Sequence, residues 1–209
     1  MLLVQCLDRV DTKAMTLGRA ANVLWQHAQV RQELIELFDV LSERIPHVTA
    51  TLGEYETVPL RVHAKYTRLE ILAAVSVSDG VDVRAWREGV LYSEDLKADV
   101  FAFTLDKTSG QFSPTTRYRD YAISRELIHW ESQSMTRETS QTGVRYREHV
   151  ALGSGILLFA RMSADDRAFH CLGPATYVSH VGEQPMAITW RLRHLLPGDL
   201  FQAFAAAVA

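Results

Sequence analysis

Residues 155–193 read GILLFARMSADDRAFHCLGPATYVSHVGEQPMAITWRLR, a series of apolar runs separated by short polar turns. The run at residues 155–162 is apolar at successive positions, which predicts a strand buried on both faces. Residues 169–172 and 175–180 are predicted to form two more strands, and residues 186–193 alternate between apolar and polar side chains as a fourth. Several short strands this close together predict a mostly antiparallel sheet.

Further strands are predicted upstream of this region. Residues 99–105 alternate between two faces, and residues 58–62 suit a short strand. Residues 81–92 are predicted to form a hairpin, with a glycine near its turn.

Helices are predicted at both ends of the chain. An apolar stripe at three- and four-residue spacing runs through residues 19–45 and predicts one or two helices. Thr67, followed three residues later by Glu70, fits a capping box at the start of a short helix. Residues 197–204 predict a closing helix with Asp199 as its cap.

These elements predict an α+β fold with a curved, mostly antiparallel sheet or partial β-barrel, flanked by N- and C-terminal helices. Residues 1–50 are predicted to be a helical lead-in or connector, and residues 51–209 a β-rich domain.

The composition excludes several classes of protein. With a net charge of -3 the chain carries no global basic field, so any contact with nucleic acid must use a local patch. Cys6 and Cys171 lack CxxC spacing and are too few for a disulfide scaffold, which favours a reduced, cytoplasmic protein. No apolar run reaches the length of a membrane span, so we expect no membrane contact.

Catalytic signatures are absent from the sequence. It contains no phosphate-binding Walker loop, no dinucleotide fingerprint, no HExxH and no GxSxG. The histidines do not fall into ligand spacing with the cysteines, so no metal and no cofactor is predicted. We therefore predict a binding module without catalytic residues of its own, and a hydrolase using His149 or His170 is the weakest alternative.

Residues 111–146 combine aromatic rings, hydroxyls, amides and arginines without a sustained period. Rings that stack on a base, next to groups that hydrogen-bond its edge, suit the recognition of an extruded base. The candidate base-binding residues are Tyr118, Asp120, Tyr121, Trp130, Ser132, Gln133 and Ser134. Among them, Asp120 is the candidate acceptor for the exocyclic amine. The competing interpretation is a long loop whose rings, Trp130 above all, fill the core.

Positive side chains near these segments are candidates for contacts with the DNA backbone. They are Arg61, Lys65, Arg68, Arg117, Arg119, Arg145 and Arg147. For Arg145 and Arg147, an ion pair with Glu138 or Glu148 is the competing use.

Several long motifs carry a family resemblance. They are TLDKTSGQFSPTTRYRDYAISRELIHWESQS from Thr104, TGVRYREH, GILLFAR and FHCLGPATYVSHVGEQPMAITWRLRH, with HAKYTRLEIL and REGVLY upstream. Together they resemble the C-terminal domain, of unknown function, that follows the motor in a group of bacterial superfamily 2 helicases. Some of those proteins carry a phospholipase-D-type nuclease and are modification-dependent type IV restriction enzymes.

The resemblance implies a target-recognition module for double-stranded DNA that contains 5-methyl- or 5-hydroxymethylcytosine. It further implies a fold similar to SRA and PUA-like domains, which hold a flipped base, and a superfamily 2 helicase and a nuclease as partners. The alternative function is a regulatory domain that docks on the helicase motor without reading bases.

Overall fold

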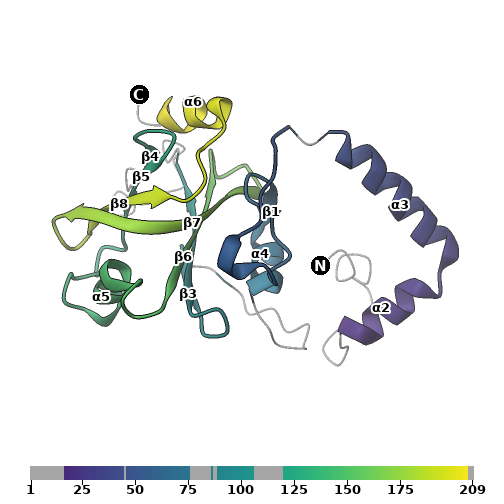
Figure 1. Cartoon of the computed structure of the whole chain (residues 1–209), viewed down its shortest axis with the longest axis horizontal. Helices are drawn as coiled ribbons and strands as arrows, with labels where there is room; N and C mark the ends of the chain where they lie inside the picture. The colour runs from purple at the N-terminus through teal and green to yellow at the C-terminus, as the bar shows by residue number, and fades with distance from the viewer. Residues whose placement is uncertain (1–16, 45, 76–85, 87–88, 106–119, 207–209) are drawn as a thin grey trace.

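The computed structural model describes residues 17–44, 46–75, 86, 89–105 and 120–206 (Figure 1). The helices are α2 (Leu17–Trp25), α3 (Ala28–Ser42), the 3-10 turn η2 (Gly53–Tyr55), α4 (Arg68–Val75), α5 (Gln141–Glu148) and α6 (Gly198–Ala206). The strands are β1 (Lys65–Thr67), β2 (Val90–Ser93), β3 (Ala98–Thr104), β4 (Tyr121–Ala122), β5 (Leu127–Glu131), β6 (Gly155–Arg161), β7 (Ala168–Val181) and β8 (Ala187–Leu192).

The strands form one 8-stranded sheet in the order β2-β3-β6-β7-β8-β5-β4, with β1 paired to β7. β3 and β6 are parallel, and the other pairs are antiparallel. The predicted α+β class and mostly antiparallel sheet are therefore confirmed. The described strands form an open sheet and do not close into a barrel.

Both faces of the central strands are buried, as the apolar run in β6 predicts. Phe101 and Leu158 point to one face, where they pack with Tyr146 of α5 and Phe204 of α6. The neighbouring side chains of β3 and β6 point to the other face, where α4 and the segment around residues 52–62 cover them. The sheet is thus enclosed between two separate hydrophobic clusters.

β7 is one continuous strand, whereas the sequence predicts two strands separated by Gly173 and Pro174. Gly173 adopts a φ of +85°, and a Cβ placed there would lie 2.9 Å from a methyl of Val62. The register between β6 and β7 shifts at Leu158/Phe159, which accommodates an extra residue in β7. Gly173 is therefore required by a β-bulge and by the close approach of Val62, and it does not mark a turn.

The predicted N-terminal helices are confirmed as α2 and α3, which stand apart from the sheet in Figure 1. The capping box at α4 is also confirmed: the Thr67 N–H donates to Glu70 Oε2 at 2.6 Å, and the Glu70 N–H donates to Thr67 Oγ1 at 3.3 Å. Asp199 lies inside the first turn of α6, where its carboxylate binds His47 at 2.8 Å.

One strand prediction differs from the structure. Residues 58–62 form no strand, and an isolated bridge joins Ala50 to Val62. Of the hairpin predicted over residues 81–92, residues 81–85 and 87–88 lie outside the described residues, and its second half forms β2, which pairs with β3. In the described part of the chain, every helix is too short or too polar to cross a membrane.

Candidate functional site

Trp130 lies in the core and not at a surface that could hold a base. It is 4% exposed, and its ring meets Phe101 edge-on at 4.7 Å and Tyr146 at 5.8 Å. β5 alternates buried and partly buried residues, so Trp130 falls on the inner face of a regular strand. The structure therefore places the main predicted stacking ring inside the protein.

Asp120 and Ser132 are also buried, and both bind the backbone of their own domain. Asp120 Oδ1 accepts a hydrogen bond from the Glu131 N–H at 2.9 Å. Ser132 Oγ accepts one from the Met186 N–H at 2.8 Å, which joins the end of β5 to the start of β8. These groups satisfy buried backbone donors, which would be costly to leave unpaired.

The remaining base-binding candidates lie nearer the surface. Tyr121 is partly exposed and stacks on His129, with ring centroids 4.8 Å apart. Gln133 and Ser134 are exposed. Tyr118, Arg117 and Arg119 lie outside the described residues.

Arg145 forms a buried ion pair. Its Nε and Nη2 donate to the two carboxylate oxygens of Asp99 at 2.6 and 2.8 Å, and its guanidinium lies 4.4 Å from the Tyr92 ring centroid. Burial raises the pKa of the Asp99 carboxyl, and the hydrogen bonds and charge of the Arg145 guanidinium oppose that rise. Arg145 thus joins α5 to β3 and is already committed to a carboxylate.

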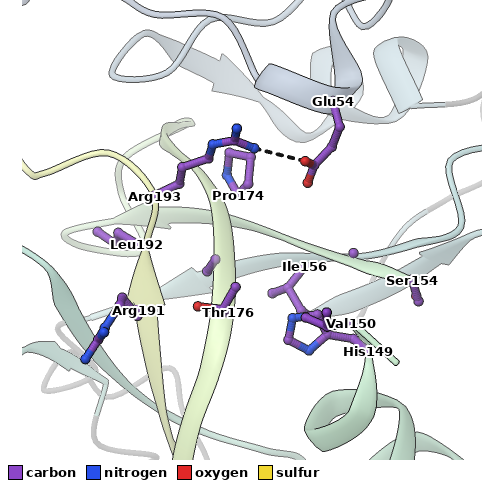
Figure 2. Close-up of a pocket in the computed structure, with 12 residues that line it drawn as sticks. Glu54, His149, Val150, Ser154, Ile156, Pro174, Thr176, Arg191, Leu192 and Arg193 are labelled. Atoms are coloured by element: carbon purple, nitrogen blue, oxygen red, sulfur yellow. Dashed lines mark hydrogen bonds and ion pairs between the residues drawn. The ribbon is translucent and has the colours of Figure 1, made fainter. Parts of the chain in front are cut away.

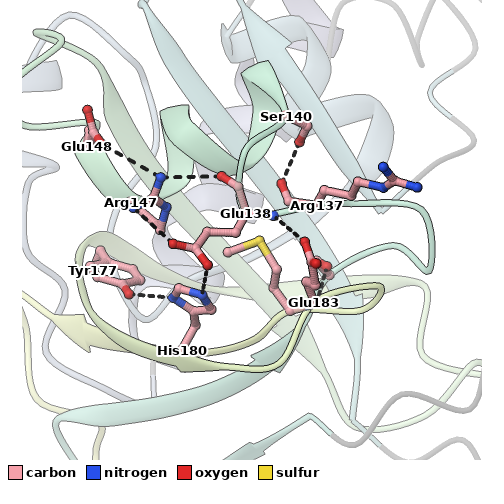
Figure 3. Close-up of polar contacts among 10 residues, drawn as sticks. Arg137, Glu138, Ser140, Arg147, Glu148, Tyr177, His180 and Glu183 are labelled. Carbon is pink, nitrogen blue, oxygen red and sulfur yellow. Dashed lines mark hydrogen bonds and ion pairs between the residues drawn. The ribbon is translucent and has the colours of Figure 1, made fainter.

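Arg147 belongs to a surface network around Glu138 (Figure 3). It lies 3.5 Å from the Glu138 carboxylate and 3.7 Å from that of Glu148, the pairs that the competing interpretation named. The second Glu138 oxygen lies 3.5 Å from His180 Nε2, and the Tyr177 hydroxyl contacts His180 Nδ1 at 2.7 Å. The network holds the long end of β7 against the segment before α5.

The other basic candidates lie around β1. Arg61 and Lys65 are exposed. Arg68 is partly buried and donates to the carbonyls of Trp86 and Ala102 at 3.2 and 3.4 Å. Burial lowers the pKa of Arg68, and the charge of Arg161 lowers it further. Arg61 and Lys65 are therefore the more accessible of these cations.

A pocket of about 500 Å³ opens on a different part of the surface (Figure 2). Five segments line it: Glu54 of η2, His149 after α5, Ile156 of β6, Thr176 of β7, and Arg191 to Arg193 at the end of β8. The described candidates for base and DNA-backbone contacts do not line it.

His149 is the most unusual residue of this pocket. It ends α5, it is 3% exposed, and its Nδ1 contacts the Tyr146 carbonyl at 3.0 Å. That contact assigns the ring hydrogen to Nδ1, so Nε2 of the neutral ring is an acceptor. Nε2 is buried without a hydrogen-bond partner. Such a nitrogen costs free energy until a donor reaches it.

Two arginines lie at the edge of the pocket, each about half exposed. Arg193 Nη1 donates to Glu54 at 2.9 Å, and Arg191 Nε lies 3.5 Å from Glu126. Exposed pairs of this kind contribute about 0–1 kcal/mol, so a phosphate can replace the glutamates at little cost. The pocket therefore combines apolar walls, one buried hydrogen-bond acceptor and two arginines whose glutamate partners a phosphate could replace.

Sequence reasoning missed this site because its residues are far apart in the chain. His149 was considered only as a catalytic residue, and Arg191 only as the polar face of a strand. No group of three or more His, Cys, Asp or Glu side chains in the described part of the chain is arranged to hold a metal ion.

Comparison with known proteins gives one family. Residues 60–204 match a family described as "Domain of unknown function (DUF3427)". No curated protein matches the chain. The match contains every element from β1 to β8, whereas α2 and α3 lie outside it.

Proposed function

The chain belongs to the DUF3427 family, and we propose that it is a DNA-binding target-recognition module that reads modified cytosine in its pocket. The observation that carries this proposal is the unpartnered Nε2 of His149, a buried residue of a pocket that two half-exposed arginines also line. A base extruded from the duplex would enter the pocket while its phosphates meet Arg191 and Arg193.

The chemistry of the pocket suits the edge of cytosine. The exocyclic N4 amine is a donor and would satisfy the orphaned acceptor of His149. Thymine presents a carbonyl oxygen at that position, so two acceptors would face each other. The apolar side chains of Val150, Ile156 and Leu192 offer a wall for a 5-methyl group. Nε2 is covered in the unliganded protein, so the neighbouring side chains must move when the base enters.

The energy balance is compatible with base extrusion. Unstacking and unpairing cost a few kcal/mol. Relief of an unsatisfied buried acceptor contributes about 1–3 kcal/mol. Each contact between a half-exposed arginine and a phosphate adds about 0–1 kcal/mol. One hydrogen bond and two arginines can therefore offset the cost without an aromatic clamp.

The proposal extends to the cellular setting. A superfamily 2 helicase and a phospholipase-D-type nuclease would supply the ATP-driven and cutting steps; the 209 residues contain no phosphate-binding Walker loop. We propose a cytoplasmic location, where the buried thiol of Cys171 stays free.

Fluorescence anisotropy tests the function directly. Three duplexes that differ only in one cytosine, 5-methylcytosine or 5-hydroxymethylcytosine would be titrated with the 209-residue protein at one salt concentration. We expect at least tenfold tighter binding of a modified duplex, which corresponds to about 1.4 kcal/mol. Equal binding to all three duplexes would refute the reader function and favour a domain that docks on a motor.

A fourth duplex tests the pocket itself. It places thymine opposite the same guanine, a mismatch that is easier to extrude than a paired 5-methylcytosine. Weaker binding of this duplex despite the easier extrusion would identify rejection of the carbonyl. His149→Phe should abolish that discrimination, and His129→Phe, the same change outside the pocket, should retain it. If both variants discriminate like the wild type, the base lies elsewhere.

A further inference from the structure

Helix α3 presents an apolar surface that the rest of the described chain leaves uncovered. None of its residues is buried, and Leu37, Phe38 and Leu41 are each 47–49% exposed. Figure 1 shows α3 apart from the sheet, joined to it by the segment that precedes η2. A helix of 15 residues is marginal in water by itself, so this surface is expected to be covered in the working protein.

The spacing of the apolar side chains identifies the kind of surface. Val30, Leu34, Leu37 and Leu41 follow one another at intervals of four, three and four residues. This is the a/d pattern of a coiled-coil seam, which accepts the side chains of another helix between its own. The seam therefore fits a helix, not a strand or a flat surface.

No charged residue of α3 occupies a seam position. At 100° per residue, Glu36 and Asp39 fall on the opposite face of the helix, and Glu33 flanks the seam on the side away from Arg31. Arg31, which flanks the seam, already donates to the Trp25 carbonyl and lies over the Trp25 ring. Two such seams can approach each other without bringing like charges together.

We propose that α3 is a self-association surface and that its occupant is α3 of a second copy of this chain, antiparallel about a two-fold axis. The four-three-four spacing is symmetric about its centre, between residues 35 and 36. Val30 then meets Leu41 of the partner copy, and Leu34 meets Leu37 of the partner copy. Because the axis repeats each contact, one helix supplies four layers of side chains.

The dimer is reversible, because four layers are a small interface. A standard interface buries about 800 Å² on each partner, and one short helix covers less. We expect a dissociation constant on the order of 10–100 µM, the range of weak specific complexes. The inference does not depend on the proposed function, since α3 lies outside the family match and away from the pocket.

Sedimentation equilibrium of the complete chain between about 1 and 300 µM tests self-association. The expected result is a rise in average mass from 23.6 kDa towards twice that value. Leu37→Glu should weaken association at least tenfold. Ile35→Glu is the matched control, because Ile35 is 53% exposed on the same helix but lies off the seam. A constant monomer mass, or equal weakening of self-association by both variants, would overturn the proposal. The seam would then have to bind a helix of a different protein.

Cross-linking tests the antiparallel register. In a Cys6→Ser background, Leu34→Cys and Leu37→Cys proteins would be treated with a short bis-maleimide, separately and mixed. The antiparallel pairing predicts cross-linked dimers mainly in the mixture. Equal or better cross-linking of either variant alone would indicate parallel helices and would overturn the register.

Discussion

Replacement of Arg145 by methionine is expected to destabilise the protein strongly, because it leaves a buried carboxylate without its partner. Asp99 is 0% exposed, and Arg145 contacts both of its oxygens at 2.6 and 2.8 Å. Breaking a buried ion pair by removing one partner costs about 3–5 kcal/mol. A domain of this kind has about 5–15 kcal/mol of stability in total, so the loss is a large fraction of it.

Urea unfolding followed by circular dichroism measures this loss. Arg147→Met is the matched control, because Arg147 lies two residues further along α5 and its contacts with the exposed Glu138 and Glu148 are longer, at 3.3 to 3.7 Å. That variant should lose less than about 1 kcal/mol. A loss below about 1 kcal/mol in Arg145→Met would refute the assignment of Arg145 to the fold. Loss of DNA affinity at unchanged stability would indicate that Arg145 contacts the DNA backbone, as the sequence predicts.

The pH dependence of the variant supplies a second check. Burial raises the pKa of the Asp99 carboxyl, and without Arg145 nothing comparable opposes that rise. A carboxyl whose pKa is higher in the folded than in the unfolded protein binds more protons when folded. Its stabilising contribution is therefore present at low pH and lost as the pH rises through the folded pKa. The stability difference between wild type and variant should shrink on acidification.

Three further changes have defined outcomes. Trp130→Ala should cost about 3–5 kcal/mol in urea unfolding, because it opens a cavity among packed rings, and any loss of preference among the duplexes should accompany that loss of stability. Burial lowers the pKa of His170 to about 4, so the protein should lose up to about 3 kcal/mol as the pH falls from about 6.5 to 4, and His170→Phe should reduce that loss. Gly155→Ala would place a Cβ 1.7 Å from the Tyr55 hydroxyl, so a thermal melt should show destabilisation of about 1–3 kcal/mol, which Tyr55→Ala should partly relieve.

The sequence predicts the two central strands by different signals. β6 is predicted from its continuous apolar run, and it is buried at nearly every position. β3 is predicted from alternation between two faces, although all seven of its residues are buried. β5 was missed, although it alternates regularly, because five residues of alternation are lost in a polar, aperiodic stretch. β7 was divided in two because Gly173 and Pro174 indicate a turn locally, and only the approach of Val62 explains the glycine.

The site could not be predicted by the same reasoning. Residue type alone does not distinguish a ring that stacks on a ligand from one that stacks on the core, and Trp130 is of the second kind. Nor does it distinguish a carboxylate that reads a base from Asp120, which binds a backbone N–H. The pocket depends on side chains from residues 54 to 193 that meet only after folding.

Helix α5 connects the core to the pocket, which changes how a loss of base preference should be interpreted. Its Tyr146 packs against Trp130 at 5.8 Å, and the Tyr146 carbonyl orients His149. A substitution at Trp130 can therefore displace the pocket acceptor through Tyr146 without any contact with DNA. Such an indirect effect should appear together with a loss of stability. His149→Phe should change discrimination between thymine and 5-methylcytosine at nearly unchanged stability. The change in stability therefore distinguishes a residue that contacts the base from a residue that only positions the pocket.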